Sequence, residues 1–284
     1  MASLTEEDPH LKKILAFLLK AKGFDGHQYK PNYIKRRIAV RMRATGASDH
    51  EQYLKVLETN HQEPSLLVDK LTIHVTEFFR DPEVYQAIKK KIVPLFSETA
   101  GKIFKVWCAG CSTGEEPYSI AILMNEWKDS NPGFEFEIFA TDIDLSSIRT
   151  AAKGEYPIEA LKKLSRPQVS RWFQGQGLTA NVGPELRRHI TFRTHDLLGT
   201  WPAELADFTM VLCRNMLIYL TPPEQQKIYE QFARVLRPKG ILVLGLTETL
   251  LGTSRKYYEC VDIRHRIYQV TKSSETTVRD GMGS

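Results

Sequence analysis

The chain has 284 residues and a formal net charge of +5, a composition that suits one large domain or a core domain with a smaller one. No apolar run reaches the roughly 18 residues of a membrane span, and the acidic stretch Thr5–Asp8 does not fit a signal peptide. Four cysteines without a secretory signal are typical of reduced thiols. We therefore expect a cytoplasmic protein without membrane insertion.

The first 75 residues, approximately, have the pattern of a small all-helical module. Leu11 to Lys20 forms an amphipathic helix, and Pro31 opens a second helix. Two further helices are predicted over His50–Leu57 and Pro64–Ile73. The second helix is strongly basic, with no acid between residues 26 and 48; its cations are Lys35, Arg36, Arg37, Arg41 and Arg43. Such a run is either a solvated face or a docking surface for an acidic partner.

The stretch from Val106 to Tyr118 predicts a strand, a turn of small residues and a helix. Lys102–Trp107 is apolar enough for a strand, and Glu115–Trp127 has helical spacing. Doubly wound α/β folds place nucleotide sites at such turns, where Gly110 and Gly114 would let a ligand approach the backbone. The pair Glu115-Glu116 would repel a phosphate and favours a cationic or uncharged ligand. S-adenosylmethionine, a sulfonium with an amino group, fits.

Two simpler interpretations of this turn stay open. Ser112-x-x-Glu115 and Thr113-x-x-Glu116 both match the capping box, which stabilises a helix start whatever binds nearby. Cys108-x-x-Cys111 is either a redox pair or two small turn residues. No second Cys or His pair follows at zinc spacing, so no metal site is expected.

Polar residues end three later predicted strands. Asp142 follows Phe134–Ala140 and would hold a ribose or cap the next helix; Asp144 is the weaker ribose candidate. Asp196 follows Ile190–Arg193, and Asn215 follows Phe208–Cys213. Carboxyl ends of parallel strands meet at one edge, so these side chains should converge on one crevice. A dehydrogenase is disfavoured because the full G-x-G-x-x-G is missing. No N-P-P-Y-like stretch follows the fourth strand, which counts against amino-methylation of bases.

The rest of the chain completes a domain plan. A strand is expected over Ile241–Leu246 and a closing hairpin over Tyr257–Val270. We predict an N-terminal helical substrate-docking domain over residues 1–80 and a linker helix over 81–100. An S-adenosylmethionine-binding domain should occupy 101–270, with a β insertion at about 173–190. Residues 271–284 should form a disordered tail.

Four motifs, in order, resemble the chemotaxis receptor methyltransferases of the CheR family. They are Thr76–Arg80, Cys111–Ser119, Ala140–Asp144 and Cys213–Tyr219. The resemblance implies a Rossmann-like methyltransferase domain joined to a small all-helical domain. It also implies S-adenosylmethionine-dependent methylation of glutamates on the helical cytoplasmic bundle of bacterial chemoreceptors, giving methyl esters and S-adenosylhomocysteine.

The resemblance also assigns residues. The cofactor should be surrounded by residues from five segments: His74, Thr76, Arg80, Gly110, Glu116, Asp142, Asp196, Leu197, Asn215 and Met216. Arg80 and Tyr219 should lie closest to the substrate carboxylate. His74 stands where the family's Asn is expected, Asp196 where Asn is common, and Gly110 where Ala is usual.

The resemblance also implies a partner for the basic helix. Receptor methylation regions are acidic helical surfaces, so the expected docking residues are Arg36, Arg37, Arg41 and Arg43. The stretch Gly175–Arg188 is short for holding a receptor's C-terminal pentapeptide, which favours a pentapeptide-independent type. We also expect a monomer. Nucleic acid is not an expected partner. Two rivals remain: a nucleic-acid methyltransferase using the basic helix, and a non-catalytic adaptor that only binds S-adenosylmethionine.

Overall fold

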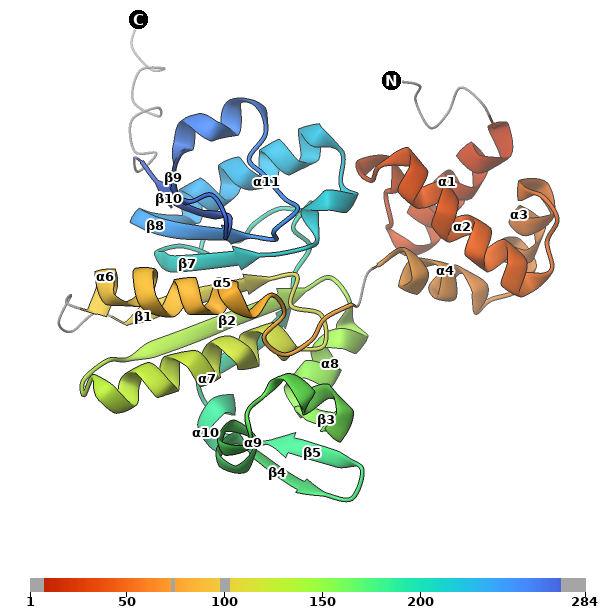
Figure 1. Cartoon of the computed structure of the whole chain (residues 1–284). Coiled ribbons are helices and arrows are strands. Elements are labelled where there is room, and N and C mark those ends of the chain that lie inside the picture. The colour runs from red at the N-terminus through yellow and green to blue at the C-terminus, as the bar shows by residue number, and fades with distance from the viewer. Residues whose placement is uncertain (1–7, 73–74, 98–102, 272–284) are drawn as a thin grey trace, which may run out of the picture. The chain divides into compact units, whose positions relative to one another are not determined.

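The computed structural model describes residues 8–72, 75–97 and 103–271 (Figure 1). The chain divides into two compact units. The helical unit contains Met1–Ile73 together with Ile218–Glu224, and the sheet unit contains His74–Leu217 together with Gln225–Ser284. The division therefore comes before residue 80, and the whole segment from Val75 to Asp81 belongs to the sheet unit.

Four α-helices form the first part of the helical unit, as the apolar pattern predicted. They are α1 (Pro9–Lys22), α2 (Pro31–Thr45), α3 (His50–Thr59) and α4 (Glu63–Leu71), with a 3-10 turn η1 (Gly26–Gln28) after α1. Asp8 and Asp49 accept hydrogen bonds from the first amides of α1 and α3. The core between the helices is apolar and closed, with Leu11, Ile14 and Ile38 fully buried.

A later stretch of chain completes the helical unit. The Lys30 N–H donates to the Tyr219 carbonyl at 2.8 Å, and the Thr221 N–H donates to the Gln28 carbonyl at 2.9 Å. The rings of Tyr33 and Tyr219 pack with centroids 4.8 Å apart. The sequence pattern gave no sign that residues 218–224 would join the N-terminal helices.

Seven strands make the main sheet of the sheet unit, in the order β6-β2-β1-β7-β8-β10-β9. Their bounds are β1 (Phe104–Ala109), β2 (Phe136–Asp142), β6 (Ile190–Thr194), β7 (Phe208–Cys213), β8 (Leu236–Leu244), β9 (Tyr258–Asp262) and β10 (Ile267–Val270). The five strands from β6 to β8 are parallel, whereas β9 and β10 form an antiparallel hairpin. This is the expected Rossmann-like sheet, and the parallel strands end at one common edge.

Helices cover both faces of this sheet (Figure 1). One face carries the nearly continuous helix α5 (Pro82–Ala87), η2 (Ile88–Ile92) and α6 (Val93–Ser97), with α7 (Glu115–Ser130) beside it. Because side chains alternate along a strand, Cys108 faces these helices, while Trp107 faces α11 (Pro222–Val235), 5.5 Å from the Phe232 ring. The helix expected as a linker over 81–100 is thus part of the core, with Ile88 fully buried.

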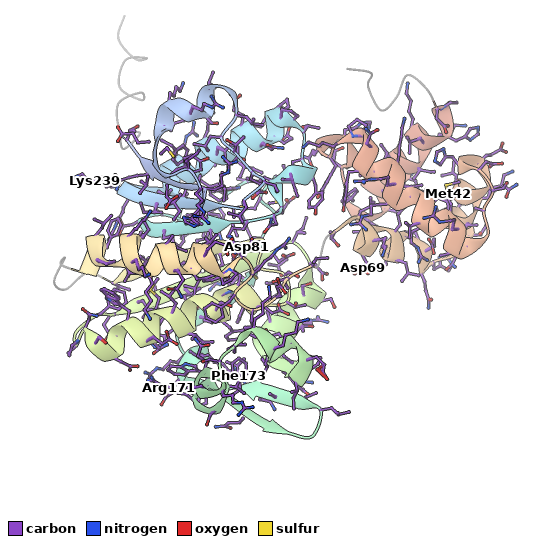
Figure 2. All side chains as sticks on the ribbon, viewed as in Figure 1. Met42, Asp69, Asp81, Arg171, Phe173 and Lys239 are labelled. Carbon is purple, nitrogen blue, oxygen red and sulfur yellow. The ribbon has the colours of Figure 1, made fainter. Side chains whose placement is uncertain are left out.

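A smaller sheet is inserted between β2 and β6, after α8 (Leu145–Lys153). Its strands β3 (Glu155–Pro157), β5 (Thr179–Val182) and β4 (Phe173–Gln176) pair antiparallel in that order. Around them lie η3 (Ile158–Lys163), α9 (Arg166–Trp172) and α10 (Pro184–Arg187). The insertion begins earlier than the expected residue 173, because β3 has only three residues and leaves no alternating pattern to detect. Figure 2 shows Arg171 and Phe173 on this insertion.

Two short turns complete the described elements, η4 (Leu217–Tyr219) and η5 (Gly252–Tyr257). Among the described residues, none of the helices is long and apolar enough to cross a bilayer. The expected tail over 271–284 lies outside the described residues, except for Thr271.

Candidate cofactor site

The turn after β1 is fixed against the end of β2. The N–H groups of Gly110 and Cys111 donate to the Thr141 carbonyl at 2.8 and 2.9 Å. Gly110 and Gly114 both have positive φ, +77° and +99°, a region that favours glycine. A Cβ on Gly114 would also lie 2.8 Å from the Ala151 Cβ, so helix α8 approaches the turn too closely for any side chain there.

Gly114 is the N-cap of α7, and no side chain caps this helix. The two capping boxes expected at Ser112 and Thr113 are therefore wrong. The Thr113 hydroxyl donates instead to the Glu115 carboxylate at 2.8 Å. The helix begins one to two residues later than the boxes require, because the left-handed glycine ends the turn.

Asp142 lies at the end of β2 with 9% of its surface exposed. One carboxylate oxygen accepts the Ser112 N–H at 2.8 Å, and the other accepts the Asp144 N–H at 3.0 Å. Asp144 is the residue that caps α8, through the amides of Ser146 and Ser147. Asp142 is thus an oriented acceptor beside the glycine turn, while the capping role belongs to its neighbour.

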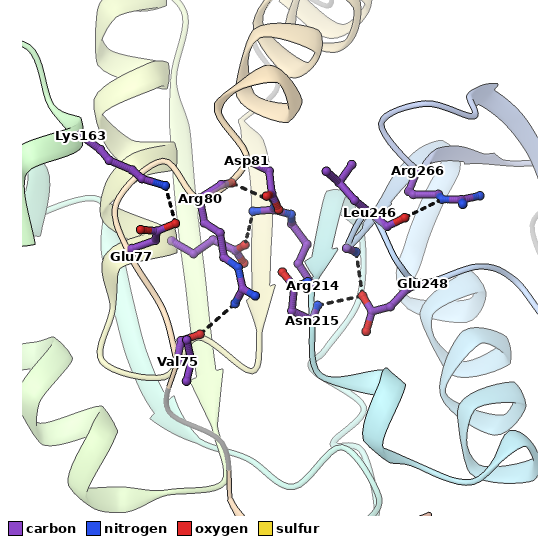
Figure 3. Close-up of polar contacts among 12 residues, drawn as sticks. Val75, Glu77, Arg80, Asp81, Lys163, Arg214, Asn215, Leu246, Glu248 and Arg266 are labelled. Atoms are coloured by element: carbon purple, nitrogen blue, oxygen red, sulfur yellow. Dashed lines mark hydrogen bonds and ion pairs between the residues drawn. The ribbon is translucent and has the colours of Figure 1, made fainter.

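Arg214 joins three segments that are far apart in the sequence. Its guanidinium is 2% exposed and donates to the Glu116 carboxylate at 3.2 Å, to the Asp81 carboxylate at 2.7 Å and to the Arg80 carbonyl at 2.9 Å. It also lies over the Tyr85 ring, 5.6 Å from the centroid. Figure 3 shows Arg214 reaching Asp81, with Asn215 beside it. The sequence predicted no role for Arg214, although it immediately precedes Asn215 and Met216, which were assigned to the site.

The segment Val75–Asp81, which we call the strap, runs ahead of α5. Arg80 donates to the Val75 carbonyl at 2.9 Å (Figure 3). The Phe79 N–H donates to the Ser119 hydroxyl of α7 at 2.9 Å. Thr76 is half-buried on the same segment, and His74 lies outside the described residues.

Asn215 follows β7 in a left-handed conformation, with φ +59°. Its N–H and that of Gly245 both donate to the same Glu248 oxygen, at 2.8 and 2.7 Å. This carboxylate ties the ends of β7 and β8 together. Within the described part of the chain, the side-chain oxygen of Asn215 is buried without a hydrogen-bond partner, so a ligand donor would satisfy it.

The loop after β6 brings the remaining assigned residues to this edge. The His195 N–H donates to the Asp142 carbonyl at 3.0 Å, so Asp196 and Leu197 follow directly on the acidic strand end. Trp201 donates to the Leu197 carbonyl at 3.0 Å and closes the loop. On the other side, the Met216 side chain lies 3.6 Å from the position that a Cβ on Gly110 would take.

The buried groups of the site have shifted pKa values. Burial raises the pKa of Glu116, although Arg214 opposes that shift. Burial also raises the pKa of the Cys108 and Cys111 thiols well above the usual value, so both are protonated near neutrality and unsuited to redox exchange. Both are free thiols; Cys108 lies in strand β1 and Cys111 lies in the turn. In the described ranges, no cluster of His, Cys, Asp or Glu could hold a metal ion.

The assembled residues fit S-adenosylmethionine. Oriented acceptors dominate: the Asp142 carboxylate, the Glu116 carboxylate and the unsatisfied Asn215 oxygen. Such a set suits ribose hydroxyls and a cationic group and would repel pyrophosphate. Gly110 lets the Met216 side chain lie close to the turn.

Comparison with known families decides the assignment. Residues 74–267 match the family described as CheR methyltransferase, SAM binding domain, and residues 9–72 match the CheR methyltransferase all-alpha domain. The chain belongs to the CheR methyltransferase family. Its sheet unit is therefore an S-adenosylmethionine-binding methyltransferase domain, as the sequence motifs predicted.

Named relatives agree with the family. The chemotaxis protein methyltransferase of Escherichia coli K12 is 31% identical over 264 residues, which cover 89% of each chain. That of Listeria monocytogenes is 33% identical over 231 residues, 81% of this chain and 86% of the relative. A 104.1 kDa protein of Rhodobacter capsulatus is 33% identical over 255 residues, yet this chain spans only 26% of its length.

Tyr219 belongs to the helical unit, whereas the residues just described belong to the sheet unit. Its ring packs on Tyr33, and the Arg37 guanidinium lies 5.3 Å from the centroid of the Tyr33 ring. Arg36 and Arg43 are exposed on the same helix α2. Arg41 differs, because its guanidinium makes two bonds to the buried Glu63, at 3.0 and 2.7 Å.

Proposed function

We propose that this CheR-family chain transfers a methyl group from S-adenosylmethionine to glutamate side chains on the cytoplasmic helical bundle of bacterial chemoreceptors. The observation that carries the proposal is the cationic surface of the helical unit, in which Arg36, Arg37 and Arg43 lie on the helix that packs against Tyr219. A helix rich in carboxylates is the partner that this surface complements.

Arg41 is left out of the proposed docking surface. Its Nε and Nη2 are both bonded to Glu63, whose side chain is 1% exposed. A guanidinium held in this way stabilises the helical unit and has fewer donors left for a partner. The docking proposal therefore rests on Arg36, Arg37 and Arg43.

The reaction asks little of the protein beyond positioning. A glutamate is ionised at neutral pH and needs no general base. The bound cofactor supplies an activated methyl group on a sulfonium. Arg80 would steer the incoming carboxylate from the strap, while Asp142 and Asn215 fix the cofactor and Tyr219 lines the approach. Alignment of this kind can contribute roughly 7–11 kcal/mol of barrier reduction.

The decisive experiment is transfer of labelled methyl groups to receptor cytoplasmic fragments, followed by mild base. Label released as methanol supports a carboxyl methyl ester. Base-stable label on RNA or DNA supports the nucleic-acid rival, and tight cofactor binding without transfer supports the adaptor. Arg80→Ala is the matched negative control, since it removes the steering cation and leaves Asp142 and Asn215 in place.

We also propose that the insertion provides no high-affinity pentapeptide tether. The hairpin of β4 and β5 turns over only two residues, Gly177 and Leu178. Replacing this hairpin with the longer loop of a peptide-binding relative should raise affinity for a receptor C-terminal peptide. Unchanged affinity after that exchange would contradict the proposal.

A further inference from the structure

The strap Val75–Asp81 is held in a strained shape. Phe79 and Asp81 have positive φ, 50° and 57°, although neither is glycine. Residues in this region are disfavoured and persist only where their surroundings fix them. The strap carries Arg80, so what fixes it also sets where that guanidinium points.

Two groups of contacts hold the first part of the strap. Phe78 is fully buried, and its ring packs edge-on against Tyr156 and Phe173 of the insertion, with centroids 5.0 and 5.5 Å away. Lys163 of the insertion pairs with Glu77, as Figure 3 shows. That pair is partly exposed and contributes little, so Phe78 is the main anchor on this side.

The other end of the strap depends on Arg214. Its Nη2 donates both to the Arg80 carbonyl and to the Asp81 carboxylate, while its Nη1 donates to Glu116 at the start of α7. These bonds are charge-assisted and shielded from water, because the Arg214 side chain is 2% exposed. One planar group thus fixes the strap, the first turn of α7 and the end of β7 together.

We infer that Arg214 is a positioning residue for methyl transfer, holding the strap and Glu116 in register so that Arg80 faces the site. Its action on transfer rests on the proposed function, whereas its hold on the strap does not. Lysine cannot replace it, since an ammonium lacks the planar fork that reaches three acceptors on two segments.

The test compares Arg214→Lys with Arg171→Lys in the full-length protein. Arg171 also makes a bidentate pair, with Asp129, but lies on the insertion, away from Asp81 (Figure 2). Hydrogen exchange followed by mass spectrometry should show roughly tenfold faster exchange in peptides covering residues 75–85 and 115–119 for Arg214→Lys, the scale of one charge-assisted bond. Arg171→Lys should leave these peptides unchanged.

Three outcomes would overturn the inference. They are unchanged exchange in the strap, a uniform increase across the sheet unit, and an equal effect of Arg171→Lys. If Arg214→Lys does not fold, Asp81→Asn decides the question, because asparagine tolerates positive φ and removes only the strap's charged acceptor. It should speed exchange in the strap alone, and unchanged exchange there would refute the role.

A second readout separates positioning from general stabilisation. With the labelled-methyl assay, Arg214→Lys should lower kcat by roughly tenfold or more, and Arg80→Ala should add little on that background, because both changes remove one arrangement. Fully multiplicative losses would show independent roles. If receptor fragments are not methylated at all, the proposed function fails while the exchange result still judges the strap.

Discussion

Arg41 is predicted to stabilise the helical unit, whereas Arg43 on the same helix is predicted to dock the receptor. Glu63 is 1% exposed and is satisfied by two bonds from Arg41 and one from the Tyr53 hydroxyl, at 2.7 Å. In Arg41→Met the carboxylate keeps its burial and loses its cation. Arg43 is exposed, so Arg43→Met is the matched control.

The expected cost follows from the burial. Removing one partner of a buried ion pair typically costs about 3–5 kcal/mol, and the 20% exposure of Arg41 places this pair near the lower end, at about 3 kcal/mol. For a unit of this size, a loss of about 3 kcal/mol corresponds to a fall in Tm of about 12 °C or more. Arg43→Met should change Tm by only a small amount.

The stability lost in Arg41→Met should decrease as the pH falls. Burial alone would raise the pKa of Glu63, but the hydrogen bonds from Arg41 and Tyr53 bring it below the usual value of 4.5. A lowered carboxyl pKa stabilises the fold above the unfolded value and loses that contribution as the pH falls. The stability gap between wild type and Arg41→Met should therefore be full near pH 7 and shrink below about pH 4.5.

Thermal and urea unfolding measure this difference, and binding to receptor fragments at two salt concentrations measures docking. Arg43→Met should weaken binding at low salt and less so at high salt, because exposed charges are screened. The reasoning fails if Arg41→Met leaves Tm unchanged, or if it reduces receptor binding as Arg43→Met does without loss of stability.

Three further predictions address the sheet unit. In urea unfolding, Gly114→Ala should lower the stability of the protein more than Gly110→Ala does. Both substitutions replace a glycine at positive φ, which costs roughly 1–2 kcal/mol. Only the new Cβ at position 114 also clashes with Ala151, which adds roughly 1–3 kcal/mol. Asp142→Asn should weaken S-adenosylmethionine binding by roughly tenfold or more in calorimetry, because it replaces a charged acceptor; equal affinity would remove Asp142 from the site. Burial lowers the pKa of His195 below 6.5, so stability should fall as the pH drops below that value, and His195→Phe should flatten this slope; an unchanged slope would place the effect elsewhere.

The sequence predicted the elements whose signal is local. The central strand β7 is an apolar run, and Phe208–Cys213 was predicted with its observed bounds. The strand-end residues Asp142, Asn215 and Asp196 could be placed because parallel strands finish at one edge. The four helices of the helical unit likewise follow from their 3.6-residue period.

Contacts between distant segments could not be predicted. Arg214 is separated from Glu116 by 98 positions and from Asp81 by 133. The residues next to Arg214 in the sequence do not indicate that it binds these two carboxylates. Strand β3 could not be predicted for the same reason, because it is defined by its pairing with the distant strand β5. The sequence likewise could not distinguish Arg41 from its exposed neighbours, because its ion-pair partner Glu63 lies on another helix.

The division into two units separates the two tasks of the proposed reaction. Asp142, Asn215 and the strap belong to the sheet unit, whereas Tyr219 and the docking arginines belong to the helical unit. Yet Tyr219 stands only three positions after Met216 in the chain. The motif Cys213–Tyr219 thus carries both residues proposed to hold the cofactor and the tyrosine proposed to face the substrate, although its two parts belong to different units.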